Sequence, residues 1–359
     1  MKTIYYYGID NNKAGMETYA LNLISNILSK SNDYKFHIIS QYEDFAYKDI
    51  FVDQLKCDYT IVPKLKKHPI KYVKTIKKIL MKSNDNDLFH LNLMSYRNFL
   101  LLHATKASKI KTMIVAHASK TDNLFNLVIH KFFRCIYKKL GYKIANNNIV
   151  SNYMFGKNAE IFETIPLGIQ IDNFRFCEEK REILRKKFSV AENDILIGQI
   201  GRISKTKNQT FTLEVLQKIK NHQNVRTLMV GKENTNTVRK LISKKSIDNV
   251  TLLGEVADMQ KIYSGIDIFV FPSLYESTGL ALYEALANGC YCICSNNVPR
   301  IDNKNDRLIY LDLSEDEWAK EIDKIINNKT YKRSDALVDV PSLEKEINSY
   351  LELYNKLTK

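Results

Sequence analysis

The strongest constraint on the fold is an alternation of short apolar segments with longer amphipathic segments, which runs along the chain in two separate series. Short apolar runs separated by helical patterns indicate βαβ units, and such units build a parallel sheet that is covered by helices on both faces. The sequence therefore predicts an α/β fold that consists of two doubly wound, Rossmann-like domains.

The first series occupies the N-terminal half of the chain. Its predicted strands lie at residues 4–8, 36–40, 88–92, 112–117 and 148–150. The first of these strands is followed by a predicted amphipathic helix, whose apolar stripe comprises Ala20, Leu21, Ile24, Ile27 and Leu28.

The second series begins at residues 195–201 and continues with predicted strands at 227–231, 250–254, 267–271, 291–295 and 308–311. Between the two series, Pro166 and Gly168 interrupt the chain in the manner of a domain boundary. We therefore predict an N-terminal domain at residues 1–168 and a C-terminal domain at residues 169–341. A last helix, at about residues 342–359, is expected to pack back onto the N-terminal domain.

Length and composition agree with two soluble cores. A chain of 359 residues is too long for one ordinary α/β core, and 45% of its residues are hydrophobic. No apolar run approaches the ~18–20 residues that a membrane span requires. The N-terminal segment Met-Lys-Thr-Ile-Tyr-Tyr-Tyr-Gly enters a strand at once and lacks the pattern of a cleaved signal peptide. We therefore expect a cytoplasmic protein.

Charge is distributed unevenly along the chain. The net charge is +14, and residues 1–170 contribute 25 basic and 13 acidic side chains, or +12, which leaves +2 for the rest. A strongly basic half favours an anionic partner, either lipid head groups or nucleic acid. A lysine-rich surface that merely faces water is the alternative.

The segment from Lys64 to Lys82 concentrates this charge, with eight lysines and one histidine. Its apolar residues recur every three or four positions and form one stripe: Ile70, Val73, Ile76, Ile79 and Leu80. A basic amphipathic helix of this kind suits an anionic membrane surface, whereas the alternative is a helix packed on its own sheet. We favour membrane docking through the N-terminal domain, at the inner face of the cell membrane.

Two further patterns could suggest a metal. Cys290, Cys292 and Cys294 alternate along one strand, but no second Cys or His pair at zinc spacing accompanies them, so core packing is the favoured interpretation. The segment Asp85-Asn86-Asp87 has the spelling of a metal-binding Asp-x-Asp, yet its surroundings have the composition of a turn. We predict no metal site and no resident cofactor.

The first candidate binding segment runs from Gly201 to Gln209, between a predicted buried strand and a helix. In an open parallel sheet, ligands bind beyond the carboxyl ends of the strands, which is where Arg202 and Lys207 are expected. An arginine fork and a lysine point charge both suit phosphate oxygens, and a departing diphosphate requires such neutralisation.

The second candidate segment, residues 271–284, contains Glu276 in a loop and Glu284 about two turns into the next helix. The backbone amides of Thr278, Gly279 and Leu280 are expected at the N-terminus of that helix, which is a natural phosphate cradle. Glu284 is suited to accept hydrogen bonds from ribose hydroxyls, and Glu276 to reach a sugar. The alternative for Glu276 is an ordinary capping or exposed glutamate.

Together these motifs resemble the family 4 retaining glycosyltransferases of the GT-B type, in particular the branch that builds bacterial capsule, exopolysaccharide and O-antigen. The similarity runs through nearly the whole chain and rests on four segments: Gly15-Met16-Glu17-Thr18, Ile165-Pro-Leu-Gly-Ile-Gln-Ile-Asp-Asn-Phe174, Gly201-Arg202…Lys207-Asn208, and Phe271-Pro272-Ser273…Glu276…Glu284-Ala285. The resemblance implies two Rossmann-like domains with an interdomain cleft.

The resemblance also implies roles for the site residues. Arg202 and Lys207 grip the donor diphosphate, Glu284 binds ribose, and Glu276 contacts the transferred sugar. The amides of Thr278, Gly279 and Leu280, with Gly15 from the other domain, complete the phosphate site. His117 falls where such enzymes have a histidine near the donor sugar, and His90 is the competing candidate. The chain departs from the family pattern at Ala14, where a second glycine is common, and at Gln170, where aspartate is common.

The activity implied is transfer of a hexose or N-acetylhexosamine from a UDP-sugar, without metal and with retention, to a cell-surface polysaccharide or to a saccharide linked to polyprenyl diphosphate. A sugar-nucleotide epimerase with the same architecture is the enzymatic alternative. A basic nucleic-acid-binding protein is the other alternative, but the basic helix lacks aromatic residues for base stacking and no nucleic-acid motif is present.

Overall fold

The computed structural model describes residues 1–13, 15–121, 123–157, 159, 163–220, 222–233, 236–301, 306–333 and 340–359. The chain divides into two compact units. The N-terminal unit comprises Met1–Pro166 together with Glu344–Lys359, and the C-terminal unit comprises Leu167–Leu343. Within the described residues, no helix is both long and apolar enough to cross a membrane.

The N-terminal unit is built on one parallel sheet with the strand order β3-β2-β1-β4-β5-β6-β7. Its strands, in that order, are Asp58–Ile61, Tyr34–Ser40, Lys2–Tyr7, Leu88–Leu93, Thr112–Ala116, Tyr142–Ala145 and Glu163–Thr164. Every pairing in it is parallel. The sequence order reverses between β1 and β4, which makes these two strands the switch point of the sheet.

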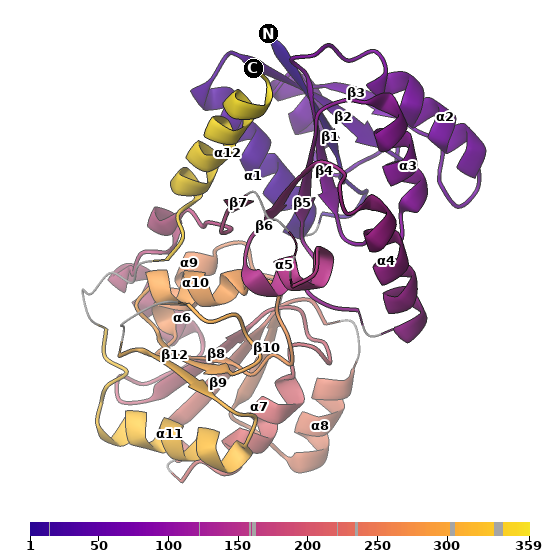
Figure 1. Ribbon diagram of the computed structural model, residues 1–359. Helices are drawn as coiled ribbons and strands as arrows, with labels where there is room; N and C mark the ends of the chain where they lie inside the picture. Colours follow the sequence, from indigo (N-terminus) through magenta and orange to yellow (C-terminus); the bar gives the residue numbers. More distant parts are fainter. Residues whose placement is uncertain are drawn as a thin grey trace. The chain divides into compact units, whose positions relative to one another are not determined.

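Helices cover both faces of this sheet (Figure 1). The helices α2 (Pro69–Leu80), α3 (Phe99–Ser108), α4 (Leu124–Tyr137) and α5 (Asn148–Met154) contribute to one apolar core. On the other face lie α1 (Gly15–Lys30) and α12 (Leu343–Leu357), with the Tyr354 ring of α12 against Tyr34, Phe36 and His90. A π-helical turn, η1 (Ile50–Gln54), precedes β3.

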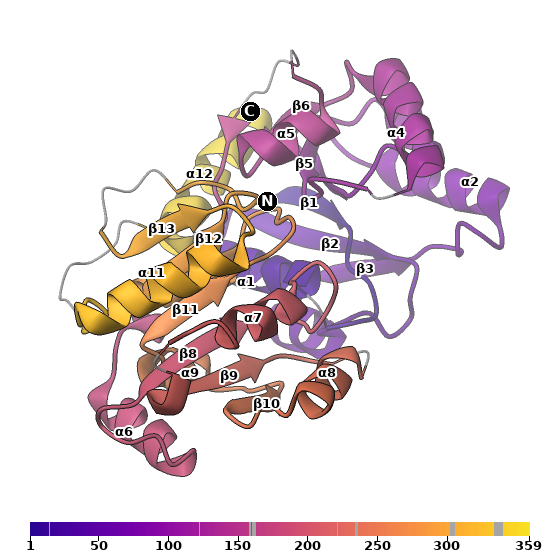
Figure 2. The ribbon, with the colours of Figure 1, turned by 90° about the horizontal axis from the view of Figure 1, so that it is seen from below.

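The C-terminal unit contains a second parallel sheet, with the order β10-β9-β8-β11-β12-β13 (Figure 2). Its strands, in that order, are Val250–Gly254, Val225–Val230, Ile195–Ile200, Ile268–Phe271, Tyr291–Ser295 and Leu308–Leu311. Adjacent residues of a strand enter different cores: Leu196 packs with α6 (Glu178–Lys187), α9 (Met259–Gly265) and α10 (Leu280–Ala287). Ile197 packs with α7 (Gln209–Leu216), α8 (Thr237–Lys245) and α11 (Glu315–Asn327). The short 3-10 helices η2 (Ile171–Phe174) and η3 (His222–Asn224) complete the unit.

The predicted α/β class with two doubly wound sheets is confirmed, but one predicted strand is wrong. Residues 148–150 begin helix α5, because the Asn147 side chain accepts a hydrogen bond from the Val150 amide at 3.0 Å and caps the helix. The strand of this region is β6, which pairs with β5. The edge strand β3 was not predicted, since its residues are largely exposed and its apolar pattern is weak.

The apolar stripe predicted on the basic helix turns inward. Ile76 and Leu80 of α2 are fully buried in the core of the N-terminal unit, and Val73 and Ile79 pack against that core. Only Ile70 remains exposed, at 72% of its surface. The stripe is therefore occupied by the helix's own sheet, so the interpretation that it faces a membrane is wrong for these residues.

The patterns that could have suggested a metal have structural roles. Cys290, Cys292 and Cys294 are fully buried among the apolar residues of one core, as the packing interpretation predicts. The buried Asp87 carboxylate accepts backbone hydrogen bonds from Thr3 at 2.7 Å and Asn84 at 2.9 Å, and so fixes the start of β4 to β1.

The two segments in which the chain passes between the units lie side by side. The Ile169 amide donates to the Pro341 carbonyl at 3.0 Å, and the Leu343 amide donates to the Ile169 carbonyl at 2.9 Å. A Cβ atom on Gly168 would come within 2.3 Å of the Ser342 backbone. Glycine at this position therefore permits the close approach of the two segments.

A buried ion network fixes the start of the two central strands of the C-terminal sheet. Asp267, which precedes β11, accepts hydrogen bonds from Arg181 at 2.6 Å and Arg185 at 2.9 Å, both on α6. Its Oδ2 also accepts the Leu196 amide of β8 at 2.8 Å. One carboxylate thus joins α6, β8 and β11, and its charge is compensated within the protein.

We expect Asp267→Ala to lower the free energy of unfolding by about 3–5 kcal/mol, because it leaves two largely buried guanidinium groups without their partner. Urea unfolding followed by the fluorescence of Trp318, the single tryptophan, reports on this unit. As the control, Asp172→Ala removes the exposed Asp172–Arg175 pair and should cost less than about 1 kcal/mol. Equal losses in the two variants would contradict the importance of the buried network.

Candidate functional site

Both predicted binding segments of the C-terminal unit follow the two central strands of its sheet. β8 and β11 are neighbours, and the strand order reverses between them. The loop of residues 201–208 follows β8, and the loop of residues 272–279 follows β11. Because parallel strands end at the same edge, the topology brings the two loops together at the switch point, where open α/β sheets bind their ligands.

The loop after β8 is held by side chains of that strand and of the helix that follows the loop. Gly201 turns the chain with φ +139°, a conformation that residues with a Cβ rarely adopt. Gln209, at the start of α7, donates to the Arg202 carbonyl and accepts from the Ser204 amide, both at 3.2 Å. The Gln199 side chain donates to the Lys207 carbonyl at 2.7 Å. The backbone that carries Arg202 and Lys207 is therefore fixed.

The loop after β11 ends in the N-terminus of α10. Gly279 is its N-cap residue, with φ +85°, and a Cβ atom there would lie 3.2 Å from the Phe271 ring. Thr278 is buried, whereas Leu280 is partly exposed. The Leu274 amide donates to the Thr206 carbonyl at 2.8 Å, and the Asn208 side chain donates to the Pro272 carbonyl at 3.2 Å. The two loops thus form one structure.

An ion pair joins the two predicted motifs directly. Lys207 Nζ lies 2.5 Å from Glu276 Oε1, and both side chains are largely buried. The same ammonium group lies 4.9 Å from the centre of the Phe271 ring, within cation–π distance. Glu276 is therefore neither a helix cap nor an exposed surface carboxylate. Residues 69 positions apart in sequence meet here as one charged pair.

Arg202 extends from the same loop but remains exposed, and its side chain has no hydrogen bond or ion pair with any residue that the structure describes. A guanidinium group left in water at a ligand-binding edge offers planar donors for phosphate or carboxylate oxygens.

Glu284 lies on α10, as predicted, and its carboxyl group is enclosed by protein. The Tyr263 hydroxyl of α9 donates to Glu284 Oε2 at 2.6 Å. Burial raises the pKa of Glu284 to about 7, while the hydrogen bond from Tyr263 and the positive charge of Lys207 act in the opposite direction. Near neutral pH, the group therefore exists both as an acid and as a carboxylate.

A second edge of the same kind exists in the N-terminal unit, at its own switch point. A cavity of about 370 Å³ opens between the loops that follow β1 and β4. Its polar lining includes Asp10, Glu17, Asn92, Arg97 and Asn98. Glu17 is buried and accepts the Asp10 amide at 3.2 Å. The cavity presents both acceptors and a cation, as a polyhydroxylated ligand requires.

The two candidate histidines differ in their surroundings. His117 directly follows β5, and its Nε2 lies 2.7 Å from Asn92 Oδ1, while the Asn92 amide nitrogen donates to the Tyr7 carbonyl at 3.0 Å. This arrangement assigns the Nε2 proton to His117, and burial lowers the pKa of the imidazole to about 4, so it is neutral. His90 lies within β4, is fully buried, and bonds Tyr354 of α12 at 2.6 Å. His90 is a core residue.

Gly15 is the first residue of α1 and is exposed, and a side chain there would meet no atom of the chain within 4 Å. It belongs to the N-terminal unit, whereas the other predicted phosphate-binding groups belong to the C-terminal unit. Its contribution to a phosphate site stays a prediction.

The sequence did not identify Tyr263 and Asn92. Tyr263 lies on a different helix from Glu284, and Asn92 lies near the end of a strand far from His117 in sequence. The only available signal for Asn92 was an amide among apolar residues at the carboxyl end of a strand. Nothing in the sequence near Tyr263 indicates its partner.

Comparison with known proteins gives a family match for most of the C-terminal unit. Residues 180–338 match the family model described as glycosyl transferases group 1. The matched range runs from α6 to beyond α11, and so contains both loops of the switch point and the Lys207–Glu276 pair. The match supports a glycosyltransferase, and the candidate site described above lies within the matched range.

Relatives of the chain include bacterial glycosyltransferases, two of which are named for capsular polysaccharide biosynthesis. The capsular polysaccharide biosynthesis glycosyltransferase CapH of Staphylococcus aureus is 26% identical over 284 residues, which cover 73% of this chain and 74% of CapH. The UDP-Gal:alpha-D-GlcNAc-diphosphoundecaprenol alpha-1,3-galactosyltransferase of Escherichia coli is 29% identical over 143 residues, or 37% of this chain and 36% of that enzyme.

Among solved structures, HepE of Anabaena in complex with UDP and glucose has a TM-score of 0.73 and 14% sequence identity, and the match covers 100% of this chain and 97% of HepE. Such a likeness establishes the fold. The two Rossmann-like domains of this glycosyltransferase are of the GT-B type, as the sequence predicts.

The environment of Glu284 in the candidate site can be tested without a ligand. We expect Tyr263→Phe to raise the pKa of Glu284 above about 7, since it removes the hydrogen bond that stabilises the carboxylate. A ¹³C NMR titration of labelled glutamate carboxyl groups measures this pKa, and Glu284→Gln identifies the signal. The control Tyr283→Phe changes a neighbouring tyrosine of α10. A lowered or unchanged pKa in Tyr263→Phe would contradict the assignment.

Proposed function

We propose that this glycosyltransferase transfers a hexose or N-acetylhexosamine from a UDP-sugar, with retention and without a metal, to a growing cell-surface polysaccharide or to a saccharide on a polyprenyl diphosphate. The observation that carries the proposal is the Lys207–Glu276 pair at the switch point, beside the N-terminus of α10. A cation, a sugar-binding carboxylate and a helix N-terminus are together what a nucleotide-sugar requires.

The donor diphosphate is bound by charges of two kinds. Arg202, exposed in the loop after β8, reaches the outer phosphate oxygens with its planar fork. Lys207 supplies a second positive charge, and the amides of Thr278, Gly279 and Leu280 accommodate phosphate at the N-terminus of α10. As the bond to the sugar breaks, the diphosphate gains negative charge, and these fixed groups stabilise it without rearrangement.

Two carboxylates bind the remaining parts of the donor. Glu284 accepts hydrogen bonds from ribose hydroxyls, and Tyr263 orients it for that purpose. Glu276 accepts hydrogen bonds from hydroxyls of the transferred sugar. Its pairing with Lys207 supports this role, because the pair keeps the carboxylate ionised and oriented beside the phosphate-binding cation.

Transfer with retention requires the acceptor oxygen to attack the face from which the nucleotide departs. The bond from the anomeric carbon to the phosphate oxygen breaks, the bond to the acceptor oxygen forms, and the acceptor proton passes to the departing phosphate oxygen. No enzyme nucleophile is needed. His117 is neutral at physiological pH, so it acts near the donor sugar as a hydrogen-bonding group and not as a general acid.

The N-terminal unit provides the acceptor site and contributes Gly15 and His117. Its cavity of about 370 Å³, with Glu17, Asn92 and Arg97 in its lining, suits a saccharide. The names of two similar proteins support the substrates proposed here. The Escherichia coli relative uses UDP-Gal and a diphosphoundecaprenol-linked acceptor, and the HepE structure contains UDP and glucose.

With such an acceptor, the enzyme acts at the inner face of the cytoplasmic membrane. The anionic lipids of that face attract the basic N-terminal half. A sugar-nucleotide epimerase is not favoured, since the family match and the relatives are glycosyltransferases. An epimerase would convert the donor without an acceptor. Nucleic acid is not proposed as a partner.

The donor site is tested by the thermal stability of the protein with UDP-glucose, GDP-mannose and ADP-glucose. UDP-glucose at 100 times its dissociation constant should add about 2.7 kcal/mol to the stability of the folded state. Its affinity should rise as the pH increases through about 7, since the ribose hydroxyls require the carboxylate form of Glu284. Glu284→Gln should bind weakly and lose this pH dependence. Stabilisation by none of the three donors would contradict the proposed site.

Arg202→Ala should reduce the turnover number by about 10²–10³-fold, because one fixed contact to the departing diphosphate is lost. UDP release in the presence of a polyprenyl-diphosphate-linked saccharide measures turnover, and ¹H NMR of the product gives its anomeric configuration. Lys205→Ala, an exposed cation in the same loop, is the matched control and should stay within a few-fold of the wild type. Wild-type turnover in Arg202→Ala would remove this residue from the mechanism. Separately, loss of activity with excess chelator would contradict transfer without a metal.

A further inference from the structure

Helix α4 exposes an apolar face that none of the described residues covers. Five large hydrophobic side chains on it lie in water, with exposed fractions that run from 48% to 76%: Leu124, Phe125, Val128, Phe132 and Ile136. Their spacing of three to four residues gathers them on one side of the helix. Monomeric soluble proteins rarely expose such a contiguous stripe, so it indicates an interaction surface.

The opposite face of α4 is fixed to its own unit, so the exposed stripe cannot turn inward. Phe133 stacks on Phe99 of α3, with ring centres 4.2 Å apart. The buried His130 accepts the Tyr96 amide at Nδ1 and donates from Nε2 to the Tyr153 carbonyl at 3.1 Å. Burial lowers the pKa of His130, so it stays neutral in this position. Figure 1 shows α4 at the outer edge of the helical layer beside α2 and α3.

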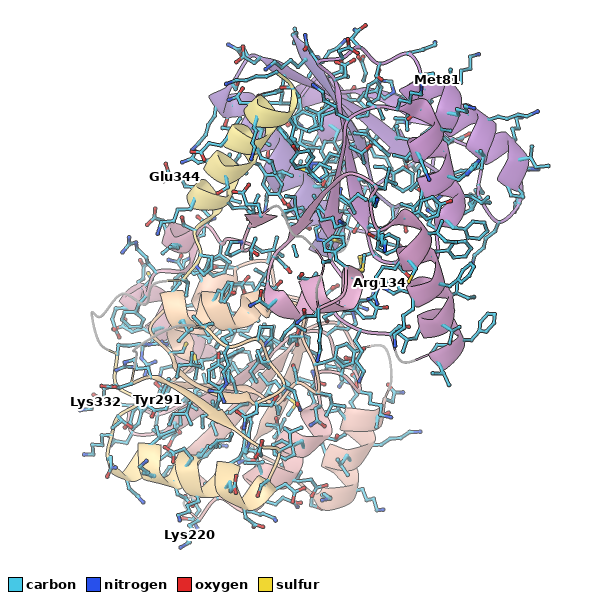
Figure 3. The ribbon with its side chains drawn as sticks, viewed as in Figure 1. Met81, Arg134, Lys220, Tyr291, Lys332 and Glu344 are labelled. Atoms are coloured by element: carbon cyan, nitrogen blue, oxygen red, sulfur yellow. The ribbon has the colours of Figure 1, made fainter. Side chains whose placement is uncertain are left out.

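Positive charge surrounds this apolar stripe. Residues 88–159 contain eleven lysine and arginine residues and a single acidic residue, Asp122. Beside the last turns of α4 lies a pocket of about 460 Å³, whose lining includes Arg134, Lys138, Lys139 and Lys143. None of the described residues that line it is acidic. Arg134, labelled in Figure 3, is oriented by a hydrogen bond to the Tyr153 carbonyl at 3.0 Å.

We propose that the exposed face of α4, together with the basic pocket beside it, docks the N-terminal unit onto an anionic lipid bilayer. The aromatic and aliphatic side chains enter the boundary between head groups and acyl chains, and the cations of the pocket bind lipid phosphates. The apolar side chains of α4 and the cations at and beyond its C-terminal end match the two layers of such a surface. Exposed apolar side chains alone, or cations alone, could serve other partners. The two kinds side by side fit a bilayer surface.

A second copy of this chain fits the surface less well. A symmetric dimer through α4 would bring the same cationic pockets together across the two-fold axis, with like charges facing each other. The basic helix α2 is also a poorer candidate, because Ile76 and Leu80 are buried in its own core. Docking through α4 specifies the membrane contact of the proposed function, but it depends on neither the donor nor the transfer reaction.

The test is cosedimentation of the full-length protein with vesicles of phosphatidylcholine, alone or mixed with phosphatidylglycerol. We expect binding only to the mixed vesicles. The double variant Phe125→Ser and Phe132→Ser should lower the partition coefficient at least about tenfold, since two aromatic side chains no longer enter the bilayer. The matched control is Ile70→Ser and Met81→Ser, two side chains of the α2 region that are equally exposed, and it should bind as the wild type does.

The charge contribution is tested by Lys138→Ala and Lys139→Ala, which should weaken binding to the mixed vesicles roughly fivefold per charge removed. Its control is Lys71→Ala and Lys74→Ala on α2, with a smaller effect. Retained stabilisation by UDP-glucose, checked for every variant, shows that the fold and the donor site are intact. Unchanged lipid binding in the α4 variants, or equal losses in the α2 controls, would overturn the proposal. It would also be overturned if the wild type bound no lipid and instead formed a dimer that the α4 variants lose.

Discussion

The site depends on the parallel hydrogen-bond ladder that β8 forms with both β9 and β11. Because the three strands run in one direction, their carboxyl ends meet at one edge, and the reversal of strand order leaves that edge open between the loops after β8 and β11. The buried Asp267 carboxylate fixes the other end of the same two strands to α6. Residues far apart in sequence therefore meet with a geometry that the sheet determines.

Within this frame, the polar groups of the edge are already paired before any ligand arrives. Lys207 and Glu276 compensate each other, and Tyr263 holds one oxygen of Glu284. A buried carboxylate or ammonium without a partner is costly, so the pairs allow such groups to remain in a partly enclosed site. Arg202 differs, since it remains in water, and it is the group with the most freedom to move onto an anionic ligand.

The sequence predicted those parts of the fold whose signal is local. The strands at 250–254, 291–295 and 308–311 were placed correctly, because each contains a short run of mostly apolar residues. Asn147 misled the prediction at residues 148–150, since a capping side chain changes the structure of a short apolar run. The loop residues Arg202, Lys207 and Glu276 could be predicted from their position after strands. The Tyr263–Glu284 and Asn92–His117 contacts could not, because they join elements that only the tertiary fold brings together.

The same distinction explains why α2 attracted attention and α4 did not. Periodicity detects an apolar stripe on α2, but it does not say whether that stripe meets a sheet or water, and in this unit it meets the sheet. Residues 124–137 also carry a single apolar stripe, but periodicity alone would assign such a stripe to the core. Only packing separates the two faces of α4: Phe133 and His130 turn inward, while Phe125 and Phe132 stay outside. The exposed face of α4 is thus a candidate binding surface, because the core does not bury its apolar side chains.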